Sequence, residues 1–322
     1  MADTTKHMQI MPKPSIQIAL MNPPGAQQSA ILGLADIFRL LPRLSPDGGQ
    51  SCRVDLHILD EAALDDRPLD AFLFPPSIEG APDTPHSPFV PWARARHQQG
   101  ALTCSVCAGA FWLGHAGLLD HRPATTHWAL EPQFRAMFPK VDLRPEHILV
   151  DDHDIITAGG LMAWLDLGLF LTGYWFGPDM VSRLARHLLV DPAGREQRHY
   201  SSFRPNRAHG DAQVLRSQRH IELRFAGPMA SDELATIAGL SPRTFLRRFK
   251  AATGYTPATY LQNLRIEKAR GALERSADPT AKIAWDVGYQ DASAFGRVFK
   301  SVTGLTPGAY RNRFRVSPAR AR

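Results

Sequence analysis

The chain has 322 residues, of which 44% are hydrophobic and 21% charged, and its 16 Phe, 6 Trp and 6 Tyr exclude disorder over most of its length. Three cysteines (Cys52, Cys104 and Cys107), an odd and small number, do not suit a disulfide framework. The sequence shows neither a signal peptide nor an apolar segment long enough to span a bilayer. We therefore expect a cytoplasmic protein without a membrane partner. The net charge of +6 divides into −4 over residues 1–210 and +10 over residues 211–322, so that only the second half is expected to meet a polyanion.

Residues 15–190 alternate short apolar runs with helical patterns, which is typical of a parallel sheet covered on both faces. Strands are predicted at 16–22, 53–59, 70–75, 101–106 and 154–158. Crossover helices are predicted near 29–41, 88–99, 109–118, 131–138 and 161–175, with one more helix at 179–190. We therefore predict an α/β domain with a flavodoxin-like, mostly parallel sheet over residues 15–190, preceded by a disordered segment, residues 1–14.

The segment ALTCSVCAGAFWLGHAGLL, which begins at residue 101, is the most suggestive chemically. A strand is expected to end at Val106, Cys107 lies on the bend, and a helix of small residues starts at Ala108-Gly109. A helix start favours the thiolate through the helix dipole and the free backbone N–H groups. This position favours the thiolate of Cys107, and we expect Cys107, Ala108 and Gly109 to line a ligand pocket. A buried thiol with a purely structural role is the alternative.

Cys104 and Cys107 also form a C-x-x-C spacing, which in another context is redox-active. Cys104 falls inside a predicted strand, so its side chain is expected to pack in the sheet. A zinc site needs two more ligands at suitable spacing, and the sequence shows none. Gly159 and Gly160, after the last predicted strand, permit either close approach to a ligand or a tight turn.

A polar, irregular passage at 191–210 is predicted to be a linker, and the segment beyond it contains a repeat. Residues 241–265 and 291–315 align without gaps at an offset of fifty, and ten of the 25 positions are identical. Upstream lies a second matched pair, ELATIAGL (233–240) and KIAWDVGYQ (282–290). Each copy has the layout of a short helix, a turn at a glycine (Gly239 or Gly288) and a second helix, so we predict an all-α domain with two helix–turn–helix motifs over 211–322.

The second helix of each copy is predicted to be amphipathic. At 100° per residue the apolar face carries Phe245, Phe249 and Ala252 in the first copy and Phe295 and Phe299 in the second. The opposite face carries Arg243, Arg247 and Lys250, and then Ser293, Arg297 and Lys300. Ser241 and Asp291 are predicted N-caps, and Gly254 and Gly304 are predicted left-handed stops. A helix with this basic face can enter a major groove, where Arg binds guanine and Lys binds phosphate.

The passage LATIAGLSPRTFLRRFKAATGYTPATYLQNLRIEKARGAL, followed by IAWDVGYQDASAFGRVFKSVTGLTPGAYRNRF, resembles the double helix–turn–helix domain of AraC-type transcription regulators. The resemblance implies that a long helix, about 257–275, holds two reading helices that enter successive major-groove segments of promoter DNA. The positions that contact bases in that family fall here on Arg243, Leu246 and Arg247, and then on Ala292, Ser293, Gly296 and Arg297. Because the second set is small and weakly polar, we expect the first helix to carry most of the discrimination, and Lys250 and Lys300 to contact phosphates.

The passage CAGAFWLGHAGLLDHRPATTHW resembles the PfpI-like branch of the class I glutamine-amidotransferase superfamily, and more narrowly the ligand-sensing domain of GlxA-type AraC regulators. The resemblance implies that Cys107 is the elbow cysteine, with His127 near it. We expect His127 and Gly160 to belong to the pocket as well. Three departures argue against catalysis. Pro76 lacks the N–H that an oxyanion hole needs, Ala30 stands where an acidic residue is expected, and no Asp or Glu is spaced to orient His127.

Together these patterns predict a bacterial, sequence-specific DNA-binding transcription regulator that has no enzymatic activity and uses no cofactor or metal. Its front domain is expected to sense a small nitrogen-containing or amino-acid-like effector, and the resemblance suggests a homodimer. Two alternatives stay open: a cysteine-dependent amidase or hydratase, and a redox sensor that uses Cys107.

Overall fold

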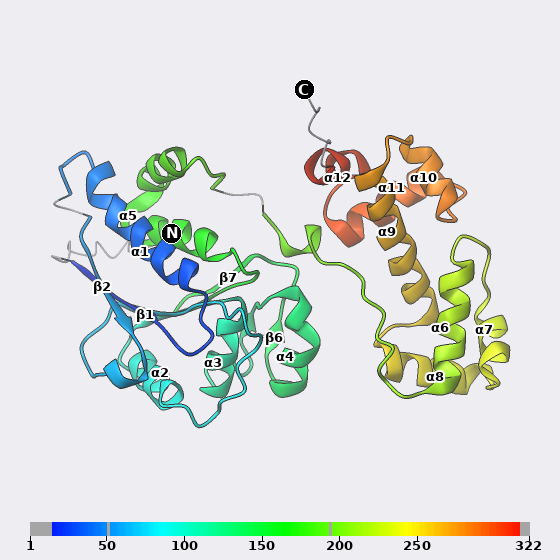
Figure 1. Cartoon of the computed structure of the whole chain (residues 1–322), viewed down its shortest axis with the longest axis horizontal. Coiled ribbons are helices and arrows are strands. Elements are labelled where there is room, and N and C mark those ends of the chain that lie inside the picture. The colour runs from blue at the N-terminus through cyan, green and yellow to red at the C-terminus, as the bar shows by residue number, and fades with distance from the viewer. Residues whose placement is uncertain (1–14, 50–51, 193–194, 316–322) are drawn as a thin grey trace, which may run out of the picture. The chain divides into compact units, whose positions relative to one another are not determined.

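The computed structural model describes residues 15–49, 52–192 and 195–315 (Figure 1), so the prediction for residues 1–14 lies outside the described part. The chain divides into two compact units, Met1–Gln197 and Arg198–Arg322. The boundary falls inside the passage 191–210 that the sequence indicates as a linker. Among the described residues, no helix is long and apolar enough to cross a membrane.

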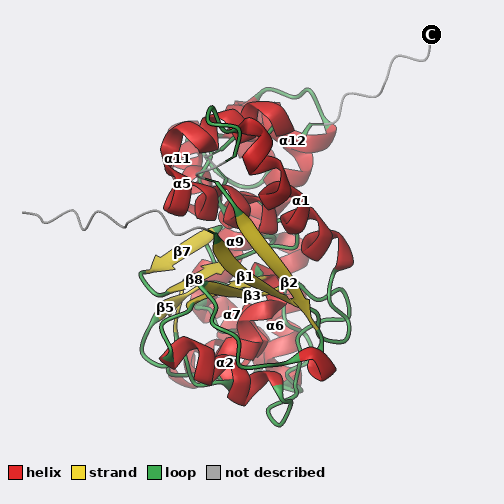
Figure 2. Cartoon of the chain, turned by 90° about the vertical axis from the view of Figure 1, so that its left-hand side faces the viewer, coloured by secondary structure: helices red, strands yellow, loops and turns green. Residues whose placement is uncertain are grey.

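The first unit is built on a six-stranded sheet with strand order β2-β1-β3-β4-β8-β7 (Figure 2). Its strands are β1 (Ile16–Met21), β2 (Val54–Leu59), β3 (Ala71–Phe74), β4 (Leu102–Val106), β7 (Leu149–Asp152) and β8 (Ile155–Ala158). Neighbouring strands pair in parallel except β7 with β8, which are antiparallel. The predicted mostly parallel sheet is confirmed, with a strand at each of the five predicted positions.

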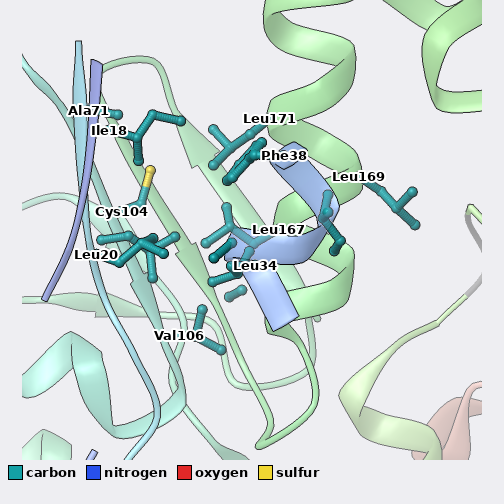
Figure 3. Packing of buried hydrophobic residues seen from close by; sticks show 14 of the residues in the cluster. Ile18, Leu20, Leu34, Phe38, Ala71, Cys104, Val106, Leu167, Leu169 and Leu171 are labelled. Carbon is teal, nitrogen blue, oxygen red and sulfur yellow. The ribbon is translucent and has the colours of Figure 1, made fainter. Parts of the chain in front are cut away.

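Each face of this sheet has its own apolar core, which explains why every residue of β3, β4 and β8 is buried. On one face α1 (Gln28–Leu44) and α5 (Trp164–Leu188) bury side chains such as Leu34, Phe38 and Leu167 against Leu20 and Cys104 (Figure 3). The other face is covered by α2 (Phe89–Gln98), α3 (Ala110–His115) and α4 (Glu131–Met137). Short 3₁₀ helices occur at Glu61–Ala63, Cys107–Gly109, Trp128–Leu130 and Gln197–His199.

Some details of this unit differ from the sequence prediction. The antiparallel edge strand β7 and a two-stranded sheet, β5 (Pro123–Ala124) with β6 (Asp142–Leu143), were not predicted, because the runs are too short to show an alternating pattern. The helices expected at 161–175 and 179–190 are assigned as α5, but Gly177 interrupts it with φ 81° and ψ 171°, just before Pro178. The break between two helical segments is therefore present, and the proline explains why the chain leaves the helix there.

The second unit is all-α, as predicted. Its helices are α6 (Ala212–Arg224), α7 (Ser231–Ala238), α8 (Pro242–Thr253), α9 (Pro257–Arg275), α10 (Thr280–Asp286), α11 (Ala292–Thr303) and α12 (Pro307–Phe314). Two separate cores form, the first around Phe245, Phe249 and the early part of α9, and the second around Phe295, Phe299 and its later part. The long helix α9 thus contributes to both halves of the repeat (Figure 1).

Candidate nucleic-acid interface and candidate ligand site

Matching aromatic packing holds the two predicted reading helices, α8 and α11. In the first copy the ring centroids of Phe245 and Phe249 lie 5.3 Å apart, and Phe249 meets Tyr260 of α9 at 5.4 Å and 82°. The equivalent contacts fifty residues later measure 5.5 Å, and 5.4 Å with 83°. The four phenylalanines are fully buried. Because edge-to-face aromatic contacts fix ring orientation, each reading helix is locked onto its own core.

The ends of the two helices also match, with one exception. Gly254 (φ 80°) and Gly304 (φ 76°) adopt the predicted left-handed stops, each donating its N–H to the carbonyl of the lysine four residues earlier. Asp291 caps α11 by accepting the N–H groups of residues 293 and 294. Ser241 is the N-cap residue of α8, as predicted, but its hydroxyl donates to Thr244 Oγ1 at 2.9 Å and makes no capping hydrogen bond to the backbone.

The face opposite the rings is exposed and basic. In α8 the exposed residues include Arg243, Leu246, Arg247 and Lys250. In α11 they include Ala292, Ser293, Arg297 and Lys300, while Gly296 is half-buried. The predicted contact positions therefore lie on the surface, whereas the phenylalanines between them are buried.

Two adjacent arginines of α8 have different environments. Arg248 is half-buried and donates hydrogen bonds of 2.9 and 2.7 Å to the carboxylate of Asp211 at the start of α6. Arg247 is exposed and makes no ion pair within the described part of the chain. The structure thus gives Arg248 a role within the fold and leaves the guanidinium of Arg247 open to solvent. In α11 the position equivalent to Arg248 is Val298, which packs against the second core.

In the first unit, Cys107 lies at a sharp bend between β4 and α3. Its φ of 57° is in the left-handed region, which is uncommon for a residue other than glycine. The bend is possible because Gly109 follows, since a Cβ there would stand 2.4 Å from the carbonyl oxygen of Phe74. The predicted elbow is therefore present, with the space beside Gly109 filled by the end of β3.

The electrostatics of the elbow contradict the expected thiolate. Cys107 is buried, and this burial raises the pKa of its thiol to about 11, although a hydrogen bond from the Ala108 N–H acts in the opposite direction. The effect of desolvation on this pKa is larger than that of the helix start, because burying the thiolate costs more free energy than one backbone hydrogen bond provides. Cys104 is likewise buried, within β4 as predicted, and burial raises the pKa of its thiol too. No disulfide joins any of the three cysteines, all of which lie in the described part of the chain.

His127 lies in the segment after β5 (Pro123–Ala124), next to the residue that contacts the elbow. Thr126 donates its hydroxyl to the carbonyl oxygen of Cys107 at 2.7 Å, which brings the neighbouring histidine to the same corner of the fold. The Nδ1 of His127 accepts the Ala129 N–H at 3.0 Å, so the neutral ring carries its proton on Nε2. Burial lowers the pKa of this histidine.

The structure places the residues of two of the predicted departures from a hydrolase, Pro76 and Ala30. Pro76 offers a carbonyl, which accepts the Gln27 N–H at 2.8 Å. Ala30 lies in the first turn of α1 and is fully buried. Among the described residues, no cluster of His, Cys, Asp and Glu is suited to hold a metal ion.

Sequence reasoning missed Gln197, which it placed in the linker. The side chain of Gln197 is only 2% exposed, and its carboxamide lies against Gly159, where a Cβ would come within 1.8 Å of its Nε2. The space beside Gly159, which the sequence left open for a ligand or a turn, is therefore occupied by the carboxamide of Gln197. Gly160 itself has φ 94° and lies near Ile148. No local signal distinguishes a buried glutamine inside a polar segment.

Comparison with known proteins adds the family context. The profile of a helix-turn-helix domain matches residues 234–313, and that of the DJ-1/PfpI family matches residues 48–171. The chain is 28% identical over 201 residues to the transcriptional regulator ArgR of Pseudomonas aeruginosa, covering 62% of this chain and 60% of that protein. It is 31% identical over 194 residues to the regulator GlxA of Rhizobium meliloti, covering 59% of each.

A third relative is an enzyme. The isonitrile hydratase of Pseudomonas putida is 27% identical over 187 residues, which cover 56% of this chain and 80% of the enzyme. The chain spans about three fifths of the length of the regulators named above. Residues 48–171 are therefore similar to the DJ-1/PfpI family and residues 234–313 to helix-turn-helix domains, and both ArgR and GlxA are named as transcriptional regulators.

Proposed function

We propose that this chain is a bacterial cytoplasmic transcription regulator in which residues 211–322 bind promoter DNA and residues 15–190 sense a small effector. The observation that carries the proposal is the pair of exposed basic faces at equivalent positions of the repeat, with Arg247 and Arg297 fifty residues apart. Each basic face belongs to a helix that packs on a buried aromatic core. The helix can therefore enter a DNA major groove as a rigid body.

The geometry of the long helix supports two contacts to one duplex. Helix α9 has 19 residues, which corresponds to a rod of about 28 Å. This length is comparable to the roughly 34 Å between successive major-groove segments on one face of DNA. In the proposal, Arg243, Leu246 and Arg247 discriminate bases, α11 adds Ala292, Ser293, Gly296 and Arg297, and Lys250 and Lys300 contact phosphates.

Selection of bound sequences from a random DNA pool tests this proposal. The full chain should enrich a motif with two conserved blocks, of which the block under α8 is the more strongly conserved. Arg247→Ala should lose that conservation, whereas Arg219→Ala, which removes an exposed arginine of α6 outside the reading helices, should keep it. Enrichment of no motif by the full chain would contradict the proposal.

For the first unit we propose ligand binding without catalysis, at the corner formed by Cys107, Ala108, Gly109, His127 and Gly160. The raised pKa of the Cys107 thiol and the Nδ1 hydrogen bond of His127 support this view, because neither group is prepared for nucleophilic attack. We further propose that the protein acts as a homodimer, which sedimentation of the full chain tests.

The hydratase likeness and the strained elbow favour one alternative, a cysteine-dependent amidase or hydratase. Cys107→Ser separates the two. It should leave DNA binding intact in both cases, and it should abolish a turnover of nitriles, isonitriles or amides only if the chain is an enzyme.

A further inference from the structure

A buried polar site of the first unit binds a carboxamide, and the chain itself supplies this group, from Gln197. The Nε2 of Gln197 donates to the carbonyl oxygens of Thr126 (2.7 Å) and His147 (2.9 Å), and lies 3.1 Å from Thr125 Oγ1. The Oε1 of Gln197 accepts the backbone N–H of Trp128 at 3.1 Å. The nitrogen therefore faces three oxygens and the oxygen faces one N–H, which fixes the orientation of the amide.

This arrangement selects for one chemical group. A carboxylate would place a negative oxygen against two carbonyls, and a guanidinium or amidinium would leave the Trp128 N–H without an acceptor. The missing side chain of Gly159 provides the space in which the group sits. A primary carboxamide fulfils both demands, and the site is closed, since the Gln197 side chain is 2% exposed.

The site also adjoins the elbow and the domain boundary. Thr126, whose carbonyl binds the amide, donates its hydroxyl to the carbonyl of Cys107. Gln197 is the last residue of the first unit. Two residues later in the chain, within the second unit, His199 Nδ1 is hydrogen-bonded at 2.8 Å to the carbonyl of Thr303, the last residue of α11.

We propose that Gln197 is a built-in occupant of a carboxamide-binding site, and that a small ligand carrying a primary carboxamide competes with it and releases the linker. Release would free the segment that leads directly into the DNA-binding unit. The regulatory consequence rests on the proposed function, whereas the site and its ligand class do not.

Chemical rescue tests the site without DNA. Gln197→Ala removes the atoms that acetamide replaces, while acetate has the same shape without the donor. Five of the six tryptophans precede residue 198, so fluorescence-monitored melting of the full chain follows the first unit. Gln197→Ala should lower the melting temperature by roughly 5 °C or more. Acetamide at about 10–200 mM should recover part of this loss with a saturable dependence, since a four-atom ligand binds at best weakly.

The controls decide between a site and a general effect. Acetate at equal ionic strength should give no recovery, and Gln197→Glu, which fills the space with a carboxylate, should be destabilised and insensitive to acetamide. Gln133→Ala, at an exposed glutamine of α4, should melt like the wild type with or without acetamide. An unchanged melting temperature in Gln197→Ala, or equal recovery by acetate, would overturn the proposal.

A measurement on the wild-type chain needs no variant. Hydrogen exchange of the Trp128 amide should be slow, because it donates to Gln197 Oε1, and fast exchange there would overturn the occupancy. DNA affinity of Gln197→Ala compared with the wild type then tests the regulatory consequence. If the wild-type chain does not bind DNA specifically, the proposed function is refuted, whereas the result of the rescue experiment is unaffected.

Discussion

Arg248 holds the carboxylate of Asp211 through two hydrogen bonds, of 2.9 and 2.7 Å, and so joins the middle of α8 to the start of α6. The same carboxylate caps α6 by accepting the N–H groups of Gln213 and Val214 at 3.2 Å. The preceding arginine, Arg247, projects from the exposed face. Two neighbouring arginines of one helix therefore have separable roles, one in the fold and one at the proposed interface.

The pair Arg247→Ala and Arg248→Ala tests this separation. Arg247→Ala should lower affinity for a specific site by about 1–3 kcal/mol, roughly five- to more than a hundredfold, and leave the free energy of unfolding unchanged. Arg248→Ala should lower that free energy by up to about 1 kcal/mol, because the ion pair is partly exposed. Gel-shift titration and urea unfolding measure the two effects. Wild-type specific affinity in Arg247→Ala would contradict the assignment.

The Asp211 contact also predicts an acid dependence. Its hydrogen bonds with Arg248 lower the pKa of Asp211 below the ordinary value of 3.8. A carboxylate whose pKa is lowered in the folded state stabilises the fold at pH above its unfolded pKa, and this contribution is lost as pH falls through the folded value. The difference in unfolding free energy between wild type and Arg248→Ala should therefore shrink between pH 7 and pH 3. An equal difference at both pH values would mean that the ion pair does not stabilise the unit.

The lysines of the reading helices should affect affinity differently from Arg247. Lys250 and Lys300 are exposed near the C-terminal ends of α8 and α11, and we propose that they contact phosphates. Replacing either by alanine should weaken binding to specific and random duplexes alike, and reduce the slope of log K against log salt by about 1. Titrations at several salt concentrations check this. A loss confined to the specific sequence would instead make the lysine a base-reading residue.

The Cys107 thiol should be unreactive near neutral pH. Burial raises its pKa to about 11, so the thiolate is scarce between pH 6 and 9. Iodoacetamide, followed by mass spectrometry of the Cys107 peptide, should show slow labelling of the folded chain and fast labelling in urea. Because a raised folded pKa favours the protonated thiol, stability should also fall as pH rises from about 9 through 11. Rapid labelling of Cys107 in the folded chain at pH 7 would contradict this prediction and favour a redox sensor or a cysteine-dependent enzyme.

The fold of the second unit was predictable from the sequence because the residues that determine it lie close together in the chain and occur in two copies. The two segments align without gaps at an offset of fifty, which predicts that the same core forms twice. The ring contacts of Phe249 with Tyr260 and of Phe299 with Tyr310 follow this repeat. Helix stops at Gly254 and Gly304 are likewise encoded within a few residues of the place where they act.

The candidate ligand site was only partly predictable. The bend at Cys107 follows from adjacent residues, but its pKa depends on how completely the remaining chain covers it, and the local helix start indicated the opposite sign. Gln197 reaches a site formed by residues about 50–70 positions earlier. Its burial is a tertiary effect, since nothing in the passage 191–210 distinguishes this glutamine from solvated neighbours.

Methylation protection of a selected operator by the full chain tests the central claim most directly. Guanine N7 lies in the major groove, so two reading helices should protect guanines in two segments about one helical turn apart on one face of the duplex. Arg247→Ala should remove protection from one segment, and Arg297→Ala should weaken it at the other. Protection that is uniform along the duplex, or that does not change in either variant, would contradict the account.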